Sequence, residues 1–354
     1  MLGSPKNYFT YQFDAISDAE EGYKAMYLIT GGAGFIGSNL VAALCDLGHS
    51  SKVVVVDNLG IDQKWKNIAN HLVYDIIAPT QLDALLAENK KEIEMVFHLG
   101  AVSSTTEIDV DLILENNLRL SMRLWKWCAI NNVPFLFASS AATYGNGENG
   151  FDDSLTSDQL ADLKPLNPYG WSKHFFDRWV TSRVENGDNL PPQWVGLKFF
   201  NVYGPNEGHK GTQSSLINQL YPKIVSGLPS ILFKSHRTGI LDGEQRRDFI
   251  WVDDCVEVML WFSNNKNISG LFNVGTGEAR TFKDLALNIY ANLDVEPNIE
   301  FIDTPPSIEK HYQYFTKASL KKLRKAGFSR SFTSLEEGVK KYVTNFLRTN
   351  DPYR

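Results

Sequence analysis

The stretch from Tyr27 to Gly37 constrains the fold of this chain more than any other. A short apolar run ends in the glycines Gly31, Gly34 and Gly37, and an amphipathic segment follows at residues 35–47. This is the order strand, tight turn, helix. Gly31 can turn the chain at positive φ, Gly34 leaves the backbone open to a pyrophosphate, and Gly37 lets the helix lie close to the strand. The stretch therefore predicts a phosphate cradle at a helix N-terminus.

A second apolar segment supports a dinucleotide site. Residues 52–56 are expected to form a buried strand that ends at Asp57, twenty residues after Gly37, where an acid meets the adenosine ribose. The residues expected to contact the cofactor here are Gly31, Gly34, Phe35, Ile36, Gly37, Asp57 and Asn58. Asp57 favours the free ribose of NAD, whereas Lys64 in the next loop would neutralise the 2′-phosphate of NADP. Both Lys64 and its neighbour Lys66 are equally well explained as solvated surface charges.

The first half of the chain alternates strands with helices. Further strands are expected at residues 71–75, 95–99 and 134–138, and helices at residues 79–89 and 111–130. This alternation predicts an α/β fold with a doubly wound parallel sheet of the Rossmann type. Gly100 and Ala101 follow one of the strands, and their small side chains would let a cofactor approach the backbone.

The second half of the chain loses this regularity. Strand-like segments are mixed with helical ones, which predicts a smaller α/β domain that is partly interleaved with the first. We assign residues 26–200 with about 249–279 to the dinucleotide-binding domain, and about 201–248 with 280–354 to a substrate-binding domain. Ligand is expected in the crevice between them, at the carboxyl ends of the strands. Residues 1–25 are acidic, lack the apolar core of a signal peptide, and are expected to be a native arm or an expression leader.

Composition limits the partners of the protein. The 354 residues carry a net charge of −6, which argues against nucleic acid or an anionic membrane as partner. No apolar run approaches the roughly 20 residues that a membrane span requires. The three cysteines show no paired spacing, which predicts a reducing, cytoplasmic compartment without a disulfide framework or a metal site.

Tyr169 and Lys173 form the second informative pattern. Side chains four apart on a helix face the same way, and a nearby ammonium favours phenolate. Such a tyrosine can exchange a proton with a substrate hydroxyl near neutral pH. The pair alone is also common on protein surfaces. About thirty residues earlier, however, the strand at 134–138 runs into Ser139 and Ser140, which places a hydroxyl at the mouth of the same crevice.

With these residues in view, the chain resembles the nucleotide-sugar-modifying branch of the extended short-chain dehydrogenase/reductase family. The resemblance implies that Ser140 hydrogen-bonds the reacting oxygen and that Tyr169 acts as acid and base. Lys173 would hold the nicotinamide ribose and lower the pKa of the tyrosine, Asp75 would meet the adenine edge, and Asn201 would help to hold the substrate. The segments that carry the resemblance are 30–37, 57, 75, 98–101, 139–145, 169–173, 201–205 and 247–249.

The resemblance also narrows the reaction. Ala141 and Ala142 stand where the dehydratases of this branch carry an Asp-Glu pair, so net elimination of water is not expected. The segments 207–211, 103–107 and 311–313 are similar to those of the epimerases that act on ADP-linked heptoses. This similarity implies inversion of C6 in ADP-D-glycero-D-manno-heptose, for lipopolysaccharide inner-core supply, by a homo-oligomer with NADP.

Chemistry gives that implication a physical reason. The C–H of an exocyclic carbinol is not acidic, whereas oxidation to an aldehyde, rotation about C5–C6 and return of the hydride invert it. The oxygen then occupies two places, so that Tyr169 would serve one and Lys210 the other. Lys210 is also interpretable as a loop lysine that binds a phosphate. His209 is expected to orient the loop, Arg247 suits a diphosphate oxygen, and Tyr312 is expected in the substrate site.

Two alternatives remain open from the sequence. One is another enzyme of the same branch, such as a UDP-hexose 4-epimerase or a net dehydrogenase. The other is a nucleotide-binding regulator without turnover, against which the intact Ser140, Tyr169 and Lys173 count.

Overall fold

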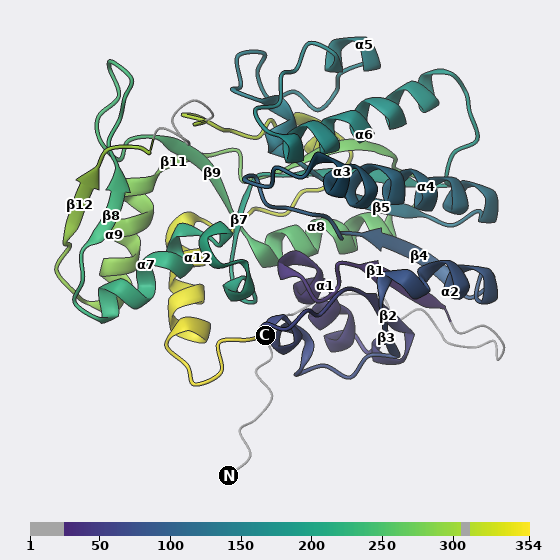
Figure 1. The fold of residues 1–354 in the computed structure, drawn as a ribbon, viewed down its shortest axis with the longest axis horizontal. Coiled ribbons are helices and arrows are strands. Elements are labelled where there is room, and N and C mark those ends of the chain that lie inside the picture. The colour runs from purple at the N-terminus through teal and green to yellow at the C-terminus, as the bar shows by residue number, and fades with distance from the viewer. Residues whose placement is uncertain (1–24, 306–311) are drawn as a thin grey trace.

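The computed structural model describes residues 25–305 and 312–354 (Figure 1). The expectations for residues 1–24 of the extension, and for His311 in the segment 311–313, lie outside the described residues. None of the helices in the described ranges combines the length and the apolarity that crossing a bilayer would require.

A seven-stranded sheet forms the larger part of the molecule. Its strand order is β10-β6-β5-β4-β1-β2-β3, and every pairing in it is parallel. The strands are β1 (Met26–Thr30), β2 (Val53–Val56), β3 (Asp75–Ile77), β4 (Ile93–His98), β5 (Phe135–Ser140), β6 (Trp194–Phe199) and β10 (Gly270–Val274). The chain moves outward from β1 first on one side and then on the other, which is the doubly wound Rossmann arrangement. The predicted fold class is confirmed.

Helices cover both faces of this sheet (Figure 1). Helices α1 (Phe35–Asp46) and α8 (Val252–Asn264) pack on one face and share an apolar core with it. Helices α2 (Leu82–Glu88), α4 (Leu120–Asn131) and α6 (Pro168–Glu185) enclose a second core on the other face. Because both faces are covered, an interior strand such as β2 is apolar and buried throughout.

A smaller part is built from two short sheets around a third apolar core. The order β11-β9-β7 joins β11 (Ala279–Thr281), β9 (Arg246–Trp251) and β7 (Asn201–Tyr203), and β12 (Ile299–Ile302) pairs with β8 (Ser230–Phe233). Its main helices are α7 (Leu216–Val225), α9 (Phe282–Leu293) and α12 (Leu335–Tyr342). The chain enters this part after β6, returns to the large sheet at β10 and leaves again. The exact division into two domains stays a prediction.

Shorter elements complete the chain. The α-helical ones are α3 (Val110–Ile113), α5 (Ser157–Leu160) and α11 (Lys321–Lys325). The 3₁₀ turns are η1 (Ser50–Lys52), η2 (Lys64–Ile68), η3 (Pro79–Gln81), η5 (Ala141–Tyr144) and η6 (Gly208–Gln213). Two π-helical segments, η4 (Leu114–Arg119) and η7 (Val343–Leu347), extend longer helices.

Two local expectations require correction. The strand predicted at residues 71–75 instead begins at Asp75, because its register with β2 pairs Val54 with Asp75, while Leu72 is 85% exposed. The helix predicted at 111–130 is interrupted by the π-helical segment η4. There the side chain of Asn117 exchanges hydrogen bonds with the backbone of Val102, at 2.8 and 3.0 Å, which ties η4 to the loop after β4.

Candidate active site

The turn after β1 leaves no room for a side chain at Gly31 or Gly37. Gly31 has a φ of 70°, and a Cβ there would lie 2.5 Å from the backbone nitrogen of Gly100. A Cβ on Gly37 would lie 2.1 Å from the carbonyl oxygen of Gly31. The amide of Gly34 donates to that same oxygen at 3.0 Å, which closes the turn before α1. The start of α1 therefore opens directly into a cleft.

Asp57 lies at the end of β2 beside this turn and is already paired. One carboxylate oxygen accepts a hydrogen bond from the backbone nitrogen of Ala33 at 2.9 Å, and the other accepts one from the ammonium nitrogen of Lys64 at 2.6 Å. Lys64 also donates to the carbonyl oxygen of Asn58 at 3.0 Å. The ion pair neutralises the charge of Asp57 at the expected ribose position. The Asn58 side chain is exposed and does not line the cleft.

Asp75 is placed at the start of β3 rather than at the end of a strand. Its carboxylate accepts the backbone amide hydrogen of Ile76 at 2.7 Å, and the residue is exposed and outside the cleft lining. Its contact with an adenine edge stays a prediction.

Tyr169 and Lys173 lie in the first turns of α6. The side chain of Asn167 caps this helix by accepting the amide hydrogen of Gly170 at 2.8 Å, and Pro168 occupies its first turn. The ammonium of Lys173 donates to the carbonyl oxygen of Ala138 in β5 at 2.8 Å. Burial lowers the pKa of Lys173 to about 8.

The expected lowering of the tyrosine pKa is not what this geometry produces. Burial raises the pKa of Tyr169, and the negative charge of Asp177 adds to this effect, while a hydrogen bond with Ser140 opposes it. Lys173 directs its ammonium at Ala138 instead of stabilising the phenolate. The Tyr169 phenol shares a hydrogen bond with Ser140.

A fully buried ion pair joins strand β6 to helix α6, which carries Tyr169 and Lys173. Lys198 in β6 and Asp177 in α6 approach to 2.6 Å, and neither side chain is exposed. Ser139 donates to the same carboxylate oxygen at 2.7 Å, and Thr143 accepts from Lys198 at 2.8 Å. The pair therefore locks the end of β5, which carries Ser140, against α6.

The loop that carries Lys210 is organised by a buried carboxylate. Glu207 is fully buried and accepts hydrogen bonds from the amide and the hydroxyl of Ser215, at 2.5 and 2.6 Å. Ser215 is the N-cap of α7, so Glu207 fastens η6 to the start of that helix. Burial raises the pKa of Glu207 and lowers that of Lys210.

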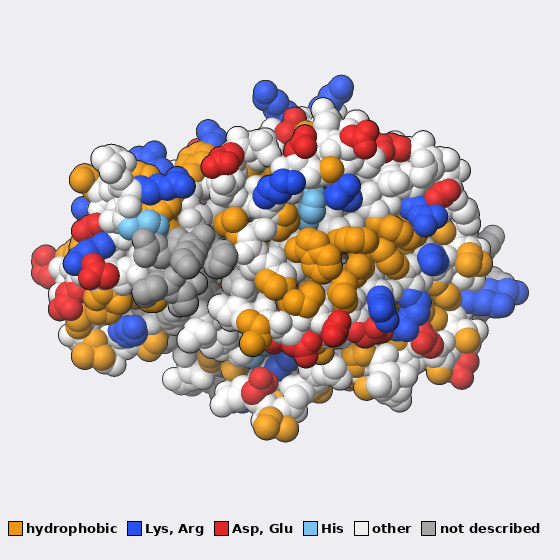
Figure 2. All heavy atoms as spheres, turned by 45° about the horizontal axis from the view of Figure 1, so that its top comes forward, with side chains coloured by type: hydrophobic (Ala, Val, Ile, Leu, Met, Phe, Trp, Pro, Cys, Tyr) orange, Lys and Arg blue, Asp and Glu red, His pale blue; other side chains and the backbone are white. Residues whose placement is uncertain are grey.

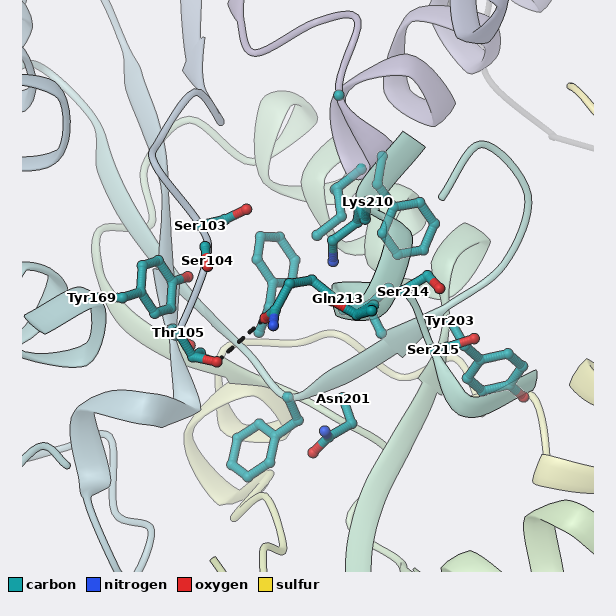
Figure 3. Close-up of a pocket in the computed structure, with 18 of the residues that line it drawn as sticks. Ser103, Ser104, Thr105, Tyr169, Asn201, Tyr203, Lys210, Gln213, Ser214 and Ser215 are labelled. Carbon is teal, nitrogen blue, oxygen red and sulfur yellow. Dashed lines mark hydrogen bonds between the residues drawn. The ribbon is translucent and has the colours of Figure 1, made fainter. Parts of the chain in front are cut away.

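The same loop faces Tyr169 across the cleft. Figure 3 shows Tyr169 and Lys210 on opposite sides of it, one from α6 and the other from η6. The ammonium of Lys210 lies 5.4 Å from the ring centre of Phe35 in α1. Gln213 extends between them, and its side-chain oxygen accepts a hydrogen bond from Thr105 at 3.3 Å (Figure 3).

The cleft has a volume of about 990 Å³ and gathers most of the predicted site residues. They are Gly31, Gly34, Phe35, Ile36, Gly37, Asp57, Lys64, Gly100, Ala101, Ser140, Tyr169, Lys173, Asn201, His209, Lys210 and Tyr312. Residues far apart in the sequence thus meet along one continuous cavity at the carboxyl edge of the sheet.

Arg247 is the predicted substrate residue that lies outside the lining. Its guanidinium is buried and sits 5.5 Å from the ring centre of Tyr312 and 5.4 Å from that of Phe282, both of which line the cleft. Burial lowers the pKa of Arg247 to about 10. Arg247 therefore supports the cleft wall from beneath in this structure.

Several residues that shape the site were not identified from the sequence. Glu207 lies three residues before Lys210, and no pattern in the neighbouring sequence predicts that its carboxylate is buried. Asn206 follows a Gly-Pro pair, a setting in which asparagine often adopts a left-handed turn, and it does so here with a φ of 71°. That pattern is the one signal that would have identified it.

A doubly wound parallel sheet with a glycine turn after β1 and a Tyr-x-x-x-Lys pair at its carboxyl edge defines the class of extended short-chain dehydrogenases/reductases. The model of the NAD dependent epimerase/dehydratase family matches residues 27–275. The chain belongs to this family.

Curated relatives share nearly the whole chain. The ADP-L-glycero-D-manno-heptose-6-epimerase of Fusobacterium nucleatum is 44% identical over 336 residues, which cover 93% of this chain and 100% of the relative. The enzyme of the same name from Nitratidesulfovibrio vulgaris is 46% identical over 330 residues, with the same coverage.

Solved structures show the same fold. The ADP-L-glycero-D-manno-heptose-6-epimerase of Helicobacter pylori matches with a TM-score of 0.73 and 26% identity, over 91% of this chain and 96% of the other. A UDP-N-acetylglucosamine 4-epimerase from Methanobrevibacter ruminantium matches with a TM-score of 0.74 and 26% identity, over 92% and 100%.

Proposed function

We propose that this protein inverts C6 of the heptose in ADP-D-glycero-D-manno-heptose and yields ADP-L-glycero-D-manno-heptose, which supplies the lipopolysaccharide inner core. The observation that carries the proposal is the placement of Tyr169 and Lys210 on opposite sides of one cleft. A carbinol that is inverted through an aldehyde places its oxygen at two sites, and each site needs a proton donor and acceptor. The relatives named for this reaction support the same substrate.

The residues of the glycine turn fit a dinucleotide. A Cβ at Gly31 or Gly37 would collide with backbone, and the residues at the start of α1 line the cleft, where a pyrophosphate would meet the helix N-terminus. The glycine turn would hold a nicotinamide dinucleotide, which would supply reversible hydride exchange with C6 of the sugar. Lys173, beside Ala138, would contact the nicotinamide ribose.

The protein residues then divide the proton transfers. Tyr169, in its phenolate form and with Ser140 as hydrogen-bond partner, accepts the hydroxyl proton in one position of the C6 oxygen. After rotation about C5–C6, Lys210 donates the proton that completes the alcohol on the other side. The reverse reaction uses the same groups in the opposite order. Each turnover therefore returns the hydride to the same sugar, while the proton that Tyr169 gains and the proton that Lys210 loses are restored by exchange with solvent.

The cofactor is proposed to be NADP. The ion pair between Lys64 and Asp57 removes the negative charge that would repel a 2′-phosphate. Lys64→Met is expected to weaken NADPH binding about tenfold or more relative to NADH, because a phosphate contact with a cation is lost. Mass spectrometry of the nucleotide that copurifies with the protein tests the assignment, and NAD as the copurifying species would overturn it.

The protein is further proposed to form a homo-oligomer. Apolar side chains gather on the face that carries α4 and α6 (Figure 2). On α3 and α6, which are in contact, Val110, Leu112, Trp171 and Phe175 are between 37% and 44% exposed. Sedimentation analysis of the wild type and of Phe175→Glu tests this. A monomeric wild type would contradict the proposal.

The proposed compartment is the cytoplasm. Cys45, Cys128 and Cys255 are all free thiols, which suits a reducing environment. Fractionation of the source cells tests this assignment, and recovery outside the cytoplasmic fraction would overturn it.

The assay that tests the function offers the purified protein ADP-D-glycero-D-manno-heptose without added cofactor and follows C6 by NMR. Activity on a UDP-hexose in place of the heptose would favour another epimerase of the family.

A further inference from the structure

The last residues of the chain fold back against the large sheet. From η7 the chain runs to a point beside α1, where Arg354 lies (Figure 1). Its guanidinium forms an ion pair with Asp253 in the first turn of α8 and donates to the side-chain oxygen of Asn39 in α1 at 3.3 Å. The other carboxylate oxygen of Asp253 accepts from the Trp251 indole at 3.0 Å. With its side chain only 10% exposed, Arg354 is firmly anchored.

Arg354 also holds Asn206, which precedes the loop that bears Lys210. The backbone amide of Arg354 donates to the side-chain oxygen of Asn206 at 3.0 Å. The amide group of Asn206 donates to the hydroxyl of Ser38 at 3.0 Å and to the carbonyl oxygen of Asn67 at 3.1 Å. One buried side chain therefore joins the end of the chain, α1 and η2.

Asn67 continues this connection to both halves of the site. Its amide nitrogen donates to the carbonyl oxygen of Ala33 in the glycine turn at 2.9 Å and lies 3.0 Å from Nδ1 of His209. Because an amide nitrogen only donates, Nδ1 of His209 is the acceptor in this contact, and burial lowers the pKa of His209. Lys210 comes next in the chain. Through Asn67, the loop is therefore hydrogen-bonded at His209 to the glycine turn. Asn206, which precedes the loop, is hydrogen-bonded to Arg354.

We propose that Arg354 is a positioning residue for the epimerisation. It fixes Asn206, and thereby holds the loop with Lys210 at a set distance from the glycine turn that seats the dinucleotide. In a reaction that transfers a hydride at C6 and a proton at the oxygen of the same carbinol, the second acid and base must keep its place relative to the nicotinamide. The kinetic part of this inference rests on the proposed function.

The kinetic test combines Arg354→Met with a matched control. Arg354→Met is expected to lower kcat about tenfold or more and to leave KM within about threefold, since displacement of a reacting group by about 1 Å costs up to about 100-fold. Arg348→Met changes an exposed arginine of the same segment and is expected to keep the wild-type rate. Arg354→Lys, which retains a charge for Asp253, is expected to recover part of the loss.

Background variants distinguish positioning from general stability. In a Lys210→Met background, Arg354→Met is expected to cause no further loss, because the group that it positions is gone. A further tenfold loss in that background would overturn the proposal, as would a wild-type kcat for Arg354→Met. If Arg354→Met does not fold, Arg354→Gln carries the same test, since it keeps a donor for Asn39 without a charge.

A measurement without substrate separates this inference from the proposed function. Hydrogen exchange is expected to rise by about tenfold or more at residues 206–213 in Arg354→Met and to stay at the wild-type level in Arg348→Met. Unchanged exchange at 206–213 overturns the positioning role. A wild type that does not act on the heptose, but whose Arg354 variant shows raised exchange there, refutes the proposed function and leaves the positioning role standing.

Discussion

The ammonium of Lys173 donates a 2.8 Å hydrogen bond to the carbonyl oxygen of Ala138, so that helix α6 is tied to strand β5 two residues before Ser140. Tyr169 and Ser140 are therefore held at a fixed separation by the same contact. Lys173 is 4% exposed, and its burial disfavours the charged form. Burial of the Lys173 ammonium therefore makes the stability of the folded protein depend on pH.

Lys173 is expected to make the stability of the cofactor-free protein rise at alkaline pH. Its pKa of about 8 in the folded protein lies below the value of about 10.4 of an unfolded lysine, so between these values the unfolded chain binds more protons. The free energy of unfolding should therefore increase from about pH 8 to about pH 10, by up to about 3 kcal/mol from this group. Denaturant titrations of the wild type and of Lys173→Met measure the difference. Equal pH profiles of the two proteins would contradict it.

Tyr169→Phe is expected to reduce turnover by roughly 10²- to 10⁴-fold, because it removes a proton donor and acceptor and leaves the ring in place. Cofactor content, measured by absorbance of the purified protein, should remain at the wild-type level. Tyr221→Phe, on α7, serves as the control and should keep its rate. Full turnover by Tyr169→Phe would remove this residue from the chemistry.

Lys210→Met is expected to abolish inversion to a similar extent, roughly 10²- to 10⁴-fold, since the amine serves the second position of the oxygen. Lys223→Met changes an exposed lysine of α7 and provides the comparison. NMR of the C6 proton gives the rate. If binding of the nucleotide sugar weakens while kcat is unchanged, Lys210 binds a phosphate instead.

Gly37→Ala is expected to expel the dinucleotide, because its Cβ would lie 2.1 Å from the carbonyl oxygen of Gly31 and would force the turn open. Gly187→Ala is a control at a positive φ of 70° with open space around the new Cβ. It should cost about 1 kcal/mol of stability and keep the cofactor. Cofactor content after gel filtration distinguishes the two, and wild-type content in Gly37→Ala would show that the turn does not seat the dinucleotide.

The sequence predicted the parts of the fold that local pattern determines. The order strand, glycine turn, helix at residues 26–46 and the apolar run of β2 are confirmed, because glycine spacing and continuous hydrophobicity are local signals. The strand expected at 71–75 was wrong because a short, weakly apolar segment takes its register from β2, which is distant in the sequence. The π-helical segment at Asn117 likewise depends on its contact with the loop after β4.

For the site too, residues in local motifs were predicted, and residues that depend on distant contacts were not. The glycines, Tyr169, Lys173 and Lys210 stand in motifs and line one cleft. Asn206 was missed because its partners lie 139 and 148 residues away. Burial also changed the electrostatics, since it raises the pKa of Tyr169 where a neighbouring lysine in the motif implies the opposite.

The fate of the hydrogen at C6 distinguishes transient oxidation of the sugar from direct deprotonation. The purified protein is incubated with ADP-D-glycero-D-manno-heptose in D₂O without added cofactor, and C6 is followed by NMR. Inversion at C6 with the original hydrogen retained is the expected result, because the hydride is returned to the carbon that lost it. Absence of inversion, or inversion with deuterium at C6, would contradict the account.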